Sequence, residues 1–146
     1  MEIEARQNGR LIVYVYGDAT GDSRRSSADR TDWYIVRKFF GQHADQYHAC
    51  VNVPSQNPTI KARVNAVNAM VCSHSGQRRL LIDPKCRELI KDFERVCWKS
   101  DPHGNLQADL DKSDPMRTHV SDAVGYWVVW EHPLRATAGP RSGRII

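Results

Sequence analysis

The stretch LIVYVYGD, residues Leu11 to Asp18, joins a short apolar run to a glycine and an aspartate. The apolar part is rich in β-branched and aromatic residues. A run of this length and composition predicts a β-strand that is buried on both faces, as in a sheet covered by helices. Gly17 ends the run, so Asp18 is expected directly at the carboxyl end of the strand.

The next segments indicate a loop, a helix and a second strand. Residues 19–30 are rich in Gly, Ser, Asp and Arg and predict an exposed loop. A helix is expected over residues 31–40, because Thr31 can cap it, Asp32 suits its first turn and Gly41 suits the position after its end. Residues 47–53 are expected to form a strand.

The middle of the chain predicts another helix and another buried strand. Asn57–Pro58 is expected to open the helix, since proline is favoured at the first helical position. Its apolar face would contain Ile60, Val64, Val67 and Val71. Residues 79–82 then predict a short buried strand, which ends at Asp83.

Two further helices are expected in the last third of the chain. Pro84 would start the first, whose apolar stripe contains Cys86, Leu89, Ile90, Phe93, Val96 and Cys97. Residues 99–115 are polar and loop-like. Thr118 can cap the last helix, which has Val120, Ala123, Val124, Trp127 and Val128 on one face and is stopped by Pro133. Strands alternating with helices predict an α/β fold with both sheet faces covered, but not the strand order.

Length and composition indicate one domain of an ordinary globular protein. The chain has 146 residues, 40% hydrophobic and 26% charged. We expect a folded domain over residues 1–132 and a loose basic tail over residues 133–146. No apolar run approaches the roughly 20 residues of a membrane span, and the polar N-terminus lacks a signal-peptide core. These features predict an intracellular protein.

Charge and motif content narrow the classes of function. The net charge of +4 and a pI near 9.0 favour polyanionic partners only modestly. The four cysteines form no C-x-x-C pair, which argues against a zinc site, and we expect them to be reduced. P-loop, H-E-x-x-H and G-x-S-x-G motifs are absent from the sequence, so it offers no support for ATPase, zinc-protease or serine-hydrolase chemistry.

Three aspartates are the candidate catalytic and metal-binding residues. Asp18 and Asp83 each follow a predicted strand, and Asp122 lies in the first turn of the last helix. Sites in open α/β sheets form beyond the carboxyl ends of strands, so these carboxylates would converge if the two strands were neighbours. Converging carboxylates need a cation, and oxygen ligands select Mg²⁺ or Mn²⁺. Two such ions can catalyse phosphodiester hydrolysis.

Each aspartate also has a purely structural interpretation. Asp18 could be an ordinary turn residue, Asp83 a helix cap before Pro84, and Asp122 a favourable charge at a helix N-terminus. Taken one at a time, these interpretations are the simpler ones, and spacing in the sequence cannot prove convergence.

Weaker candidates surround the three aspartates. His119 shares a helix face with Asp122 and could orient a ligand or a water. Asp22 lies close to Asp18 in sequence and could help to hold a metal. Arginines in the loop after Asp18 could bind DNA phosphates, namely Arg24, Arg25 and Arg30. For each of these, a solvated side chain is the alternative.

Four segments, in order, resemble the C-terminal nuclease domain of tailed-bacteriophage terminase large subunits. YGDATGDSRRSSADRTDWYIVRKFF (16–40) is similar to the first motif of that family, and NPTIKARVNAVNAM (57–70) to the helix that follows. RRLLIDPKCRELIKDFE (78–94) resembles the second acidic motif, and THVSDAVGY (118–126) the third. Together the segments cover most of the chain.

The resemblance implies a ribonuclease H-like fold, with a mixed central sheet flanked by helices. It implies an endonuclease with two Mg²⁺ or Mn²⁺ ions that cuts concatemeric viral DNA during genome packaging, with water attacking directly. Asp18, Asp83 and Asp122 would be the metal ligands. The implied partners are double-stranded DNA, the portal protein, the small terminase subunit and an N-terminal ATPase domain that this sequence lacks. The implied location is the host cytoplasm.

One feature departs from the family, and two other functions stay open. Ribonuclease H-like sheets usually begin with several antiparallel strands, whereas here a predicted helix follows the first strand. Either the helix prediction is wrong or the sheet is a shortened variant. The alternatives are another ribonuclease H-like nuclease, such as a junction resolvase, and a non-catalytic module that binds DNA or the portal.

Overall fold

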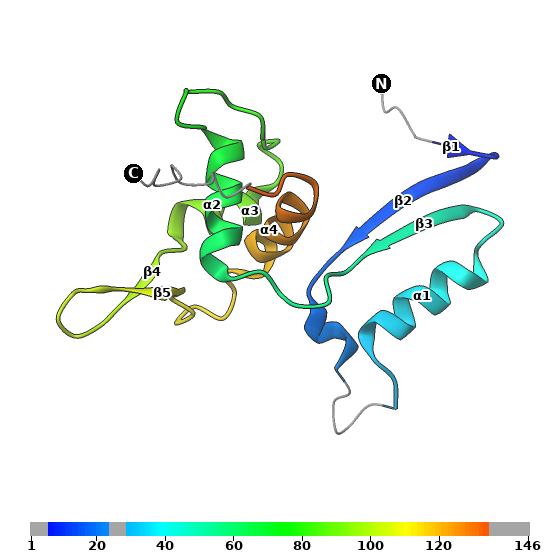
Figure 1. Ribbon diagram of the computed structural model, residues 1–146, viewed down its shortest axis with the longest axis horizontal. Helices are drawn as coiled ribbons and strands as arrows, with labels where there is room; N and C mark the ends of the chain where they lie inside the picture. Colours follow the sequence, from blue (N-terminus) through cyan, green and yellow to red (C-terminus); the bar gives the residue numbers. More distant parts are fainter. Residues whose placement is uncertain (1–5, 24–28, 135–146) are drawn as a thin grey trace, which may run out of the picture.

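Two groups of elements make up the computed structural model, which describes residues 6–23 and 29–134 (Figure 1). The first contains β1 (Arg6–Gln7), β2 (Arg10–Tyr16), the 3₁₀ helix η1 (Ala19–Asp22), α1 (Asp32–Gln42) and β3 (Tyr47–Asn52). The second contains α2 (Ile60–Val71), α3 (Arg87–Arg95), β4 (Trp98–Ser100), β5 (Leu106–Leu110) and α4 (His119–Glu131). The fold is mixed α/β, with two small sheets and four α-helices among the described residues.

The first sheet is built on a β-α-β unit. β2 and β3 are parallel, paired from Leu11 with Tyr47 to Tyr16 with Asn52, and α1 makes the crossover that a parallel pair needs. The predicted strands 11–16 and 47–53 and the predicted helix 31–40 are confirmed. β1 adds an antiparallel edge through a turn in which Asn8 and Gly9 both have positive φ, the conformation typical of two-residue hairpins.

The N-terminus of α1 is capped as expected. The Thr31 hydroxyl accepts a hydrogen bond from the Tyr34 amide at 3.2 Å. The expected end at Gly41 is wrong, because the helix continues through Gln42 and His43 occupies its C-cap. Gly41 is therefore a helical residue, and its α-carbon faces open space.

Trp33 joins α1 to the segment after β2. Its ring is buried, and its indole Nε1 donates a hydrogen bond to the Asp18 carbonyl at 2.8 Å. A β-carbon placed on Gly17 would lie 2.5 Å from Trp33 Cζ2, and one placed on Gly21 would lie 2.5 Å from Trp33 Nε1. Only glycine at these two positions lets the backbone lie this close to the indole ring.

Gly17→Ala should therefore destabilise the protein. The new methyl group would push the buried Trp33 ring out of place, which we expect to lower the free energy of unfolding by about 1–3 kcal/mol. Urea denaturation would measure this change. Gly41→Ala is the matched control, because alanine fits there and is favoured over glycine in helices by about 1 kcal/mol. Equal stability of Gly17→Ala and wild type would contradict the packing described.

Helices α2 and α4 form the centre of the second group. The buried core residues are Ala66, Val67, Met70 and Val128, against which Leu80, Phe93, Val124, Trp127 and Val129 pack. Gly125 of α4 lies against the Arg63 side chain of α2, where an added β-carbon would come within 3.4 Å of Arg63 Cβ. The helix predicted to open at Asn57–Pro58 is present, but it begins later than expected. Thr59 is its N-cap, and Pro58 lies before the helix.

The predicted strand at residues 79–82 is wrong. These residues have no β-partner; instead the amides of Arg79 and Leu80 both donate to the carbonyl of Met70, at 2.8 and 2.9 Å. Leu80 packs against the core, but Leu81 is 84% exposed. A run of three apolar residues cannot distinguish a strand from an extended segment fastened to a helix end.

Other boundaries also differ from the predictions. The helix expected from Pro84 begins at Arg87, and Asp83 does not cap it. Residues 99–115, expected to be a loop, include most of the antiparallel β4–β5 hairpin. The four cysteines are free thiols as expected, but Cys86 and Cys97 are exposed and do not belong to the core.

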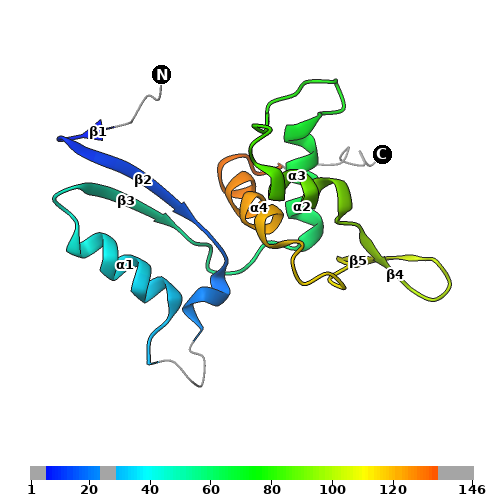
Figure 2. The ribbon, with the colours of Figure 1, turned by 180° about the vertical axis from the view of Figure 1, so that it is seen from behind.

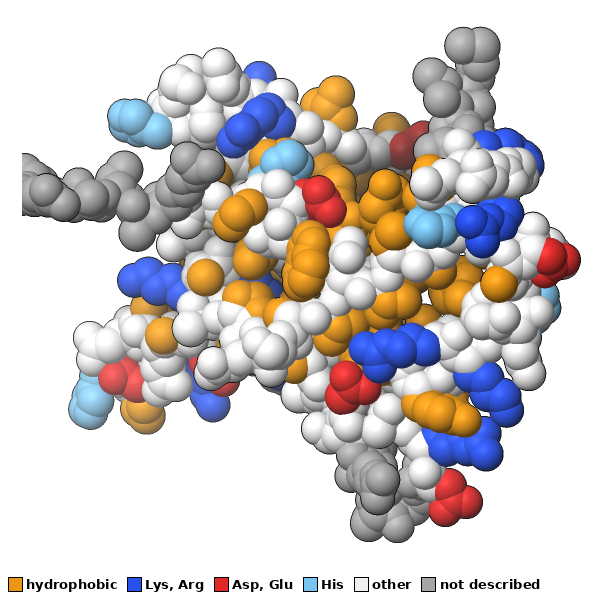
Figure 3. Space-filling model, turned by 45° about the vertical axis from the view of Figure 1, so that its right-hand side comes forward, with side chains coloured by type: hydrophobic (Ala, Val, Ile, Leu, Met, Phe, Trp, Pro, Cys, Tyr) orange, Lys and Arg blue, Asp and Glu red, His pale blue; other side chains and the backbone are white. Residues whose placement is uncertain are grey.

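The sheet is not covered on both faces as expected. α1 packs against β3, whereas α2, α3 and α4 gather beyond the carboxyl ends of β2 and β3, as Figures 1 and 2 both show. Large apolar side chains remain exposed, including Tyr14 of β2 and Ile35 and Phe39 of α1. Figure 3 shows apolar side chains across the centre of one face. No helix in the described part of the chain is long and apolar enough to cross a membrane.

Candidate functional site

Asp18 is fixed at the carboxyl end of β2 by its own turn. Its carboxylate caps η1, accepting hydrogen bonds from the Thr20 hydroxyl at 2.5 Å and the Gly21 amide at 3.1 Å. The next amide, that of Ala19, donates to Asn57 Oδ1 at 2.7 Å. The backbone around Asp18 is thus tied both to Trp33 of α1 and to the segment that leads into α2.

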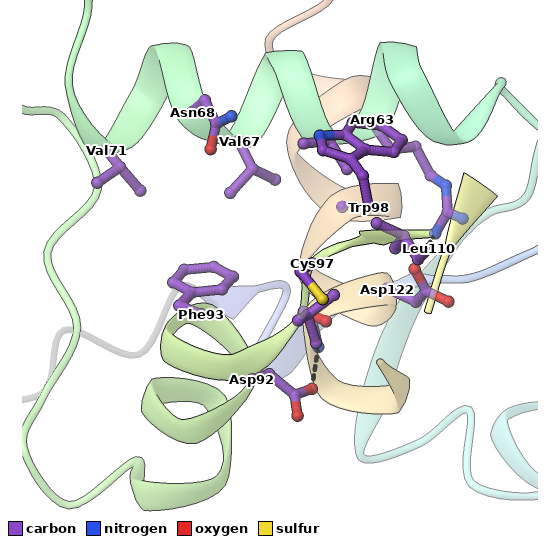
Figure 4. A pocket seen from close by; sticks show the side chains of 14 residues that line it. Arg63, Val67, Asn68, Val71, Asp92, Phe93, Cys97, Trp98, Leu110 and Asp122 are labelled. Carbon is purple, nitrogen blue, oxygen red and sulfur yellow. Dashed lines mark hydrogen bonds and ion pairs between the residues drawn. The ribbon is translucent and has the colours of Figure 1, made fainter. Parts of the chain in front are cut away.

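Asp122 is held from the other side by α2. The Arg63 guanidinium Nη1 lies 2.7 Å from Asp122 Oδ1, and both side chains are largely withdrawn from water. Figure 4 shows Arg63 extending from α2 toward Asp122 on α4. The two partners are 59 residues apart in sequence, so this ion pair depends on the packing of α2 against α4.

Tyr126 stacks against the Arg63 guanidinium. Its ring lies one helical turn after Asp122, and the Arg63 guanidinium stacks over it at 4.5 Å from the centroid. Burial raises the pKa of the Tyr126 phenol; the Arg63 charge lowers it, while the charges of both Asp18 and Asp122 raise it.

The end of β2 is fastened to α4 by a side-chain hydrogen bond. The Tyr16 hydroxyl donates a hydrogen bond to Glu131 Oε1 at 2.5 Å. Burial raises the pKa of Tyr16, and the Glu131 carboxylate raises it further. This hydrogen bond sets the carboxyl end of β2 against the last turn of α4.

Asp83 is not brought into this group. Its side chain is exposed and accepts a hydrogen bond from the Lys85 amide at 2.8 Å, which is a local turn interaction. Within residues 6–23 and 29–134, no three His, Cys, Asp or Glu side chains gather into a group that could hold a metal ion. Asp83 is not carried to the sheet edge, because the strand expected to place it there does not form.

The weaker candidates are dispersed. The exposed Asp22 pairs with Arg37 at 3.3 Å, and His119 Nε2 lies 3.1 Å from the Pro115 carbonyl. Arg30 stacks over Tyr34 of α1 at 5.0 Å. The other two predicted DNA-binding residues, Arg24 and Arg25, lie outside the described residues, as does most of the predicted basic tail.

A cavity of about 310 Å³ adjoins Asp122. It lies between α2, α3, α4 and the β4–β5 hairpin, and most of its wall is apolar, with Val67, Phe93 and Trp98 among its residues (Figure 4). Arg63, Asp92 and Asp122 supply its charged groups.

Asp92 is the centre of a second buried network. It is 1% exposed, and its carboxylate accepts hydrogen bonds from Arg117 Nη1 at 3.2 Å and from the Ser121 amide at 3.1 Å. The Thr118 side chain makes no cap and its backbone is left-handed, so Asp92 of α3 supplies the missing cap to α4. Arg117 also pairs with Glu88 at 3.2 Å and with Asp114 at 3.4 Å. This network fixes the start of α4 and therefore the position of Asp122.

Arg63, Tyr126 and Asp92 were not among the site residues predicted from the sequence. A usable signal was present for two of them. Arg63 lies at helical spacing from Ile60 and Val67, and Asp92 lies at helical spacing from Leu89 and Val96. A charged residue within an apolar helical stripe indicates a buried charge, which requires a partner from elsewhere in the fold.

Comparison of this chain with protein-family models, with curated proteins and with solved structures found no match. The site must therefore be judged on its own chemistry.

Proposed function

We propose that this chain is a metal-dependent DNA endonuclease of the ribonuclease H-like, terminase type, acting on double-stranded viral DNA during packaging. One observation carries the proposal: Asp18 directly follows β2, whose last residue, Tyr16, is hydrogen-bonded to Glu131 of α4, the helix that also carries Asp122. The site lies beyond the carboxyl end of a parallel strand, where ligands bind in open α/β sheets.

Carboxylate oxygens are the ligands that a hard divalent cation prefers. Mg²⁺ is commonly held by one or two carboxylates, with waters and substrate phosphates completing its six ligands. Asp18 and Asp122 would provide the carboxylates for one ion. Asp83 remains the proposed third ligand and the basis for a second ion. Such ions activate water and stabilise the leaving oxygen of a phosphodiester.

The residues of the chain have distinct roles in this proposal. Trp33 and Asn57 hold the backbone of the Asp18 turn. Asp92 positions the first turn of α4, which carries Asp122. The net charge of +4 favours a polyanionic substrate. Arg24, Arg25 and Arg30 remain the proposed phosphate contacts.

Plasmid cleavage by the purified chain tests the proposal. With Mn²⁺ or Mg²⁺ we expect supercoiled DNA to be converted to nicked and linear forms, and with EDTA we expect no conversion, because the proposed chemistry requires a divalent ion. Asp18→Asn, purified in the same way, controls for a contaminating nuclease. Cleavage that persists in EDTA, or the absence of cleavage by folded protein with either metal, would count against this function.

A further inference from the structure

The turn that carries Asp18 is joined to a distant part of the chain by the side chain of Asn57. Ala19 is the first residue of η1, so its backbone amide finds no acceptor within that short helix. Asn57 supplies the acceptor, since its Oδ1 lies 2.7 Å from the Ala19 nitrogen in a partly buried contact. The two residues are 38 positions apart in the sequence, so this hydrogen bond is a tertiary contact.

The peptide group between Asp18 and Ala19 is held on both sides. Its carbonyl accepts the hydrogen bond from the Trp33 indole of α1 at 2.8 Å, and its amide donates to Asn57. The first bond lies within the first group of elements, whereas the second reaches the segment between β3 and α2. The peptide group cannot rotate without breaking one of these bonds, so the backbone from which the Asp18 carboxylate extends is fixed.

Asn57 is itself placed by the residues that follow it. Pro58 disfavours a helical backbone at Asn57, which keeps that residue extended. Thr59 then caps α2, its hydroxyl accepting a hydrogen bond from the Ala62 amide at 3.2 Å. The main direct contact between elements of the two groups is that of β2 with α4. The Asn57 bond adds a second connection, which ties the Asp18 turn to the start of α2.

We propose that Asn57 is a positioning residue, which sets Asp18 relative to α2 and α4 through the Ala19 amide. This inference rests on the proposed nuclease function, in which Asp18 takes part in cleavage and Asn57 touches no reacting group. Loss of the bond would leave Asp18 at the end of β2 but free its peptide group to rotate. Placement matters for the reaction, because a displacement of about 1 Å can cost about a hundredfold in rate.

Three substitutions separate the hydrogen bond from other effects. Asn57→Ala removes the acceptor for the Ala19 amide. Asn57→Asp has the same shape and keeps an oxygen at that position, so it is the conservative variant that should restore the bond. Gln56→Ala is the matched control, because Gln56 is the neighbouring residue and its side chain is exposed.

The experiment pairs amide hydrogen exchange of the full chain, measured by NMR, with plasmid nicking in Mn²⁺. We expect Asn57→Ala to accelerate exchange of the Ala19 amide by about tenfold, because that amide loses its acceptor. We expect its kcat for nicking to fall by about tenfold while the half-saturating DNA concentration stays unchanged, because Asn57 orients Asp18 and does not bind DNA. Asn57→Asp and Gln56→Ala should match wild type in both measurements. Circular dichroism establishes that each variant is folded.

The other outcomes are distinguishable. If folded Asn57→Ala exchanges its Ala19 amide at the wild-type rate, the bond does not hold the turn and the proposal is wrong, while cleavage by wild type still supports the nuclease function. If exchange is faster but nicking is unchanged, the bond is only structural and the proposal is again wrong. If folded wild type does not cut with either metal, the nuclease function fails, and the role of Asn57 in it fails as well.

Discussion

Asp92→Ala is expected to lower the free energy of unfolding by about 3 kcal/mol. The change removes a charge-assisted hydrogen bond from Arg117, worth about 1.5–3 kcal/mol, and the cap on the Ser121 amide, worth about 1 kcal/mol. This loss of stability lies at the low end of the range for a broken buried ion pair, because Arg117 keeps its ion pairs with Glu88 and Asp114. Chemical denaturation monitored by circular dichroism measures it.

Asp114→Ala is the matched control for Asp92→Ala. Asp114 pairs with the same arginine at 3.4 Å, but its side chain is half exposed, so its loss should cost less than about 1 kcal/mol. Asp92→Asn should lose an amount of stability between those of the two alanine variants, since the amide oxygen can still accept a hydrogen bond from one of the two donors. If Asp92→Ala and Asp114→Ala lowered the free energy of unfolding by the same small amount, Asp92 would not be the cap of α4.

Asp18→Asn and Asp122→Asn are each expected to reduce DNA cleavage by about a thousandfold or more. Removing a metal-binding carboxylate would forfeit several kcal/mol of transition-state stabilisation, and each 1.4 kcal/mol corresponds to about a tenfold change in rate. Asparagine Oδ1 can still accept the hydrogen bonds from Thr20 and Gly21 at position 18, and the one from Arg63 at position 122. Asp18→Asn should therefore fold, whereas Asp122→Asn leaves the buried Arg63 charge without its carboxylate, so its cleavage rate counts only when circular dichroism shows folded protein. Initial rates of plasmid nicking in Mn²⁺ give the comparison.

Asp83→Asn and Asp45→Asn complete that series. Asp45 lies in the turn between α1 and β3, at the opposite end of the parallel strands from Asp18, so its variant should cut like wild type. A large loss in Asp83→Asn would indicate that Asp83 joins the site when metal and DNA are present. Wild-type rates in Asp83→Asn would leave a site of two carboxylates. Wild-type rates in Asp18→Asn would remove the basis of the nuclease proposal.

The β-α-β unit was readable from the sequence because its signals are local. The run LIVYVY has the length and composition of a buried strand, Thr31 caps the helix that follows, and residues 47–52 are β-rich. Helices α2 and α4 were equally visible, but their predicted apolar faces were partly wrong, because Val71 of α2 and Val120 of α4 are exposed. Each of these patterns is a property of ten or so neighbouring residues, and no distant contact overrides it.

Segments with weak local signals were predicted wrongly. Residues 79–82 have only three apolar side chains, and their hydrogen-bonding partner, the Met70 carbonyl, is available only because α2 ends beside them. The β4–β5 hairpin lies in a polar stretch without strand periodicity, so its pairing was not visible in the sequence. In both cases contacts made in the folded chain decided the local conformation.

The sequence by itself determined that this is a mixed α/β chain with an aspartate at the end of its first long strand and another in the first turn of its last helix. Only the tertiary structure decided what surrounds them. Packing of α2 against α4 buries Arg63 beside Asp122, and a hydrogen bond from Tyr16 to Glu131 fastens the end of β2 to α4. Buried charges select partners that are near in space, and nearness in space is set by packing that a one-dimensional pattern does not encode.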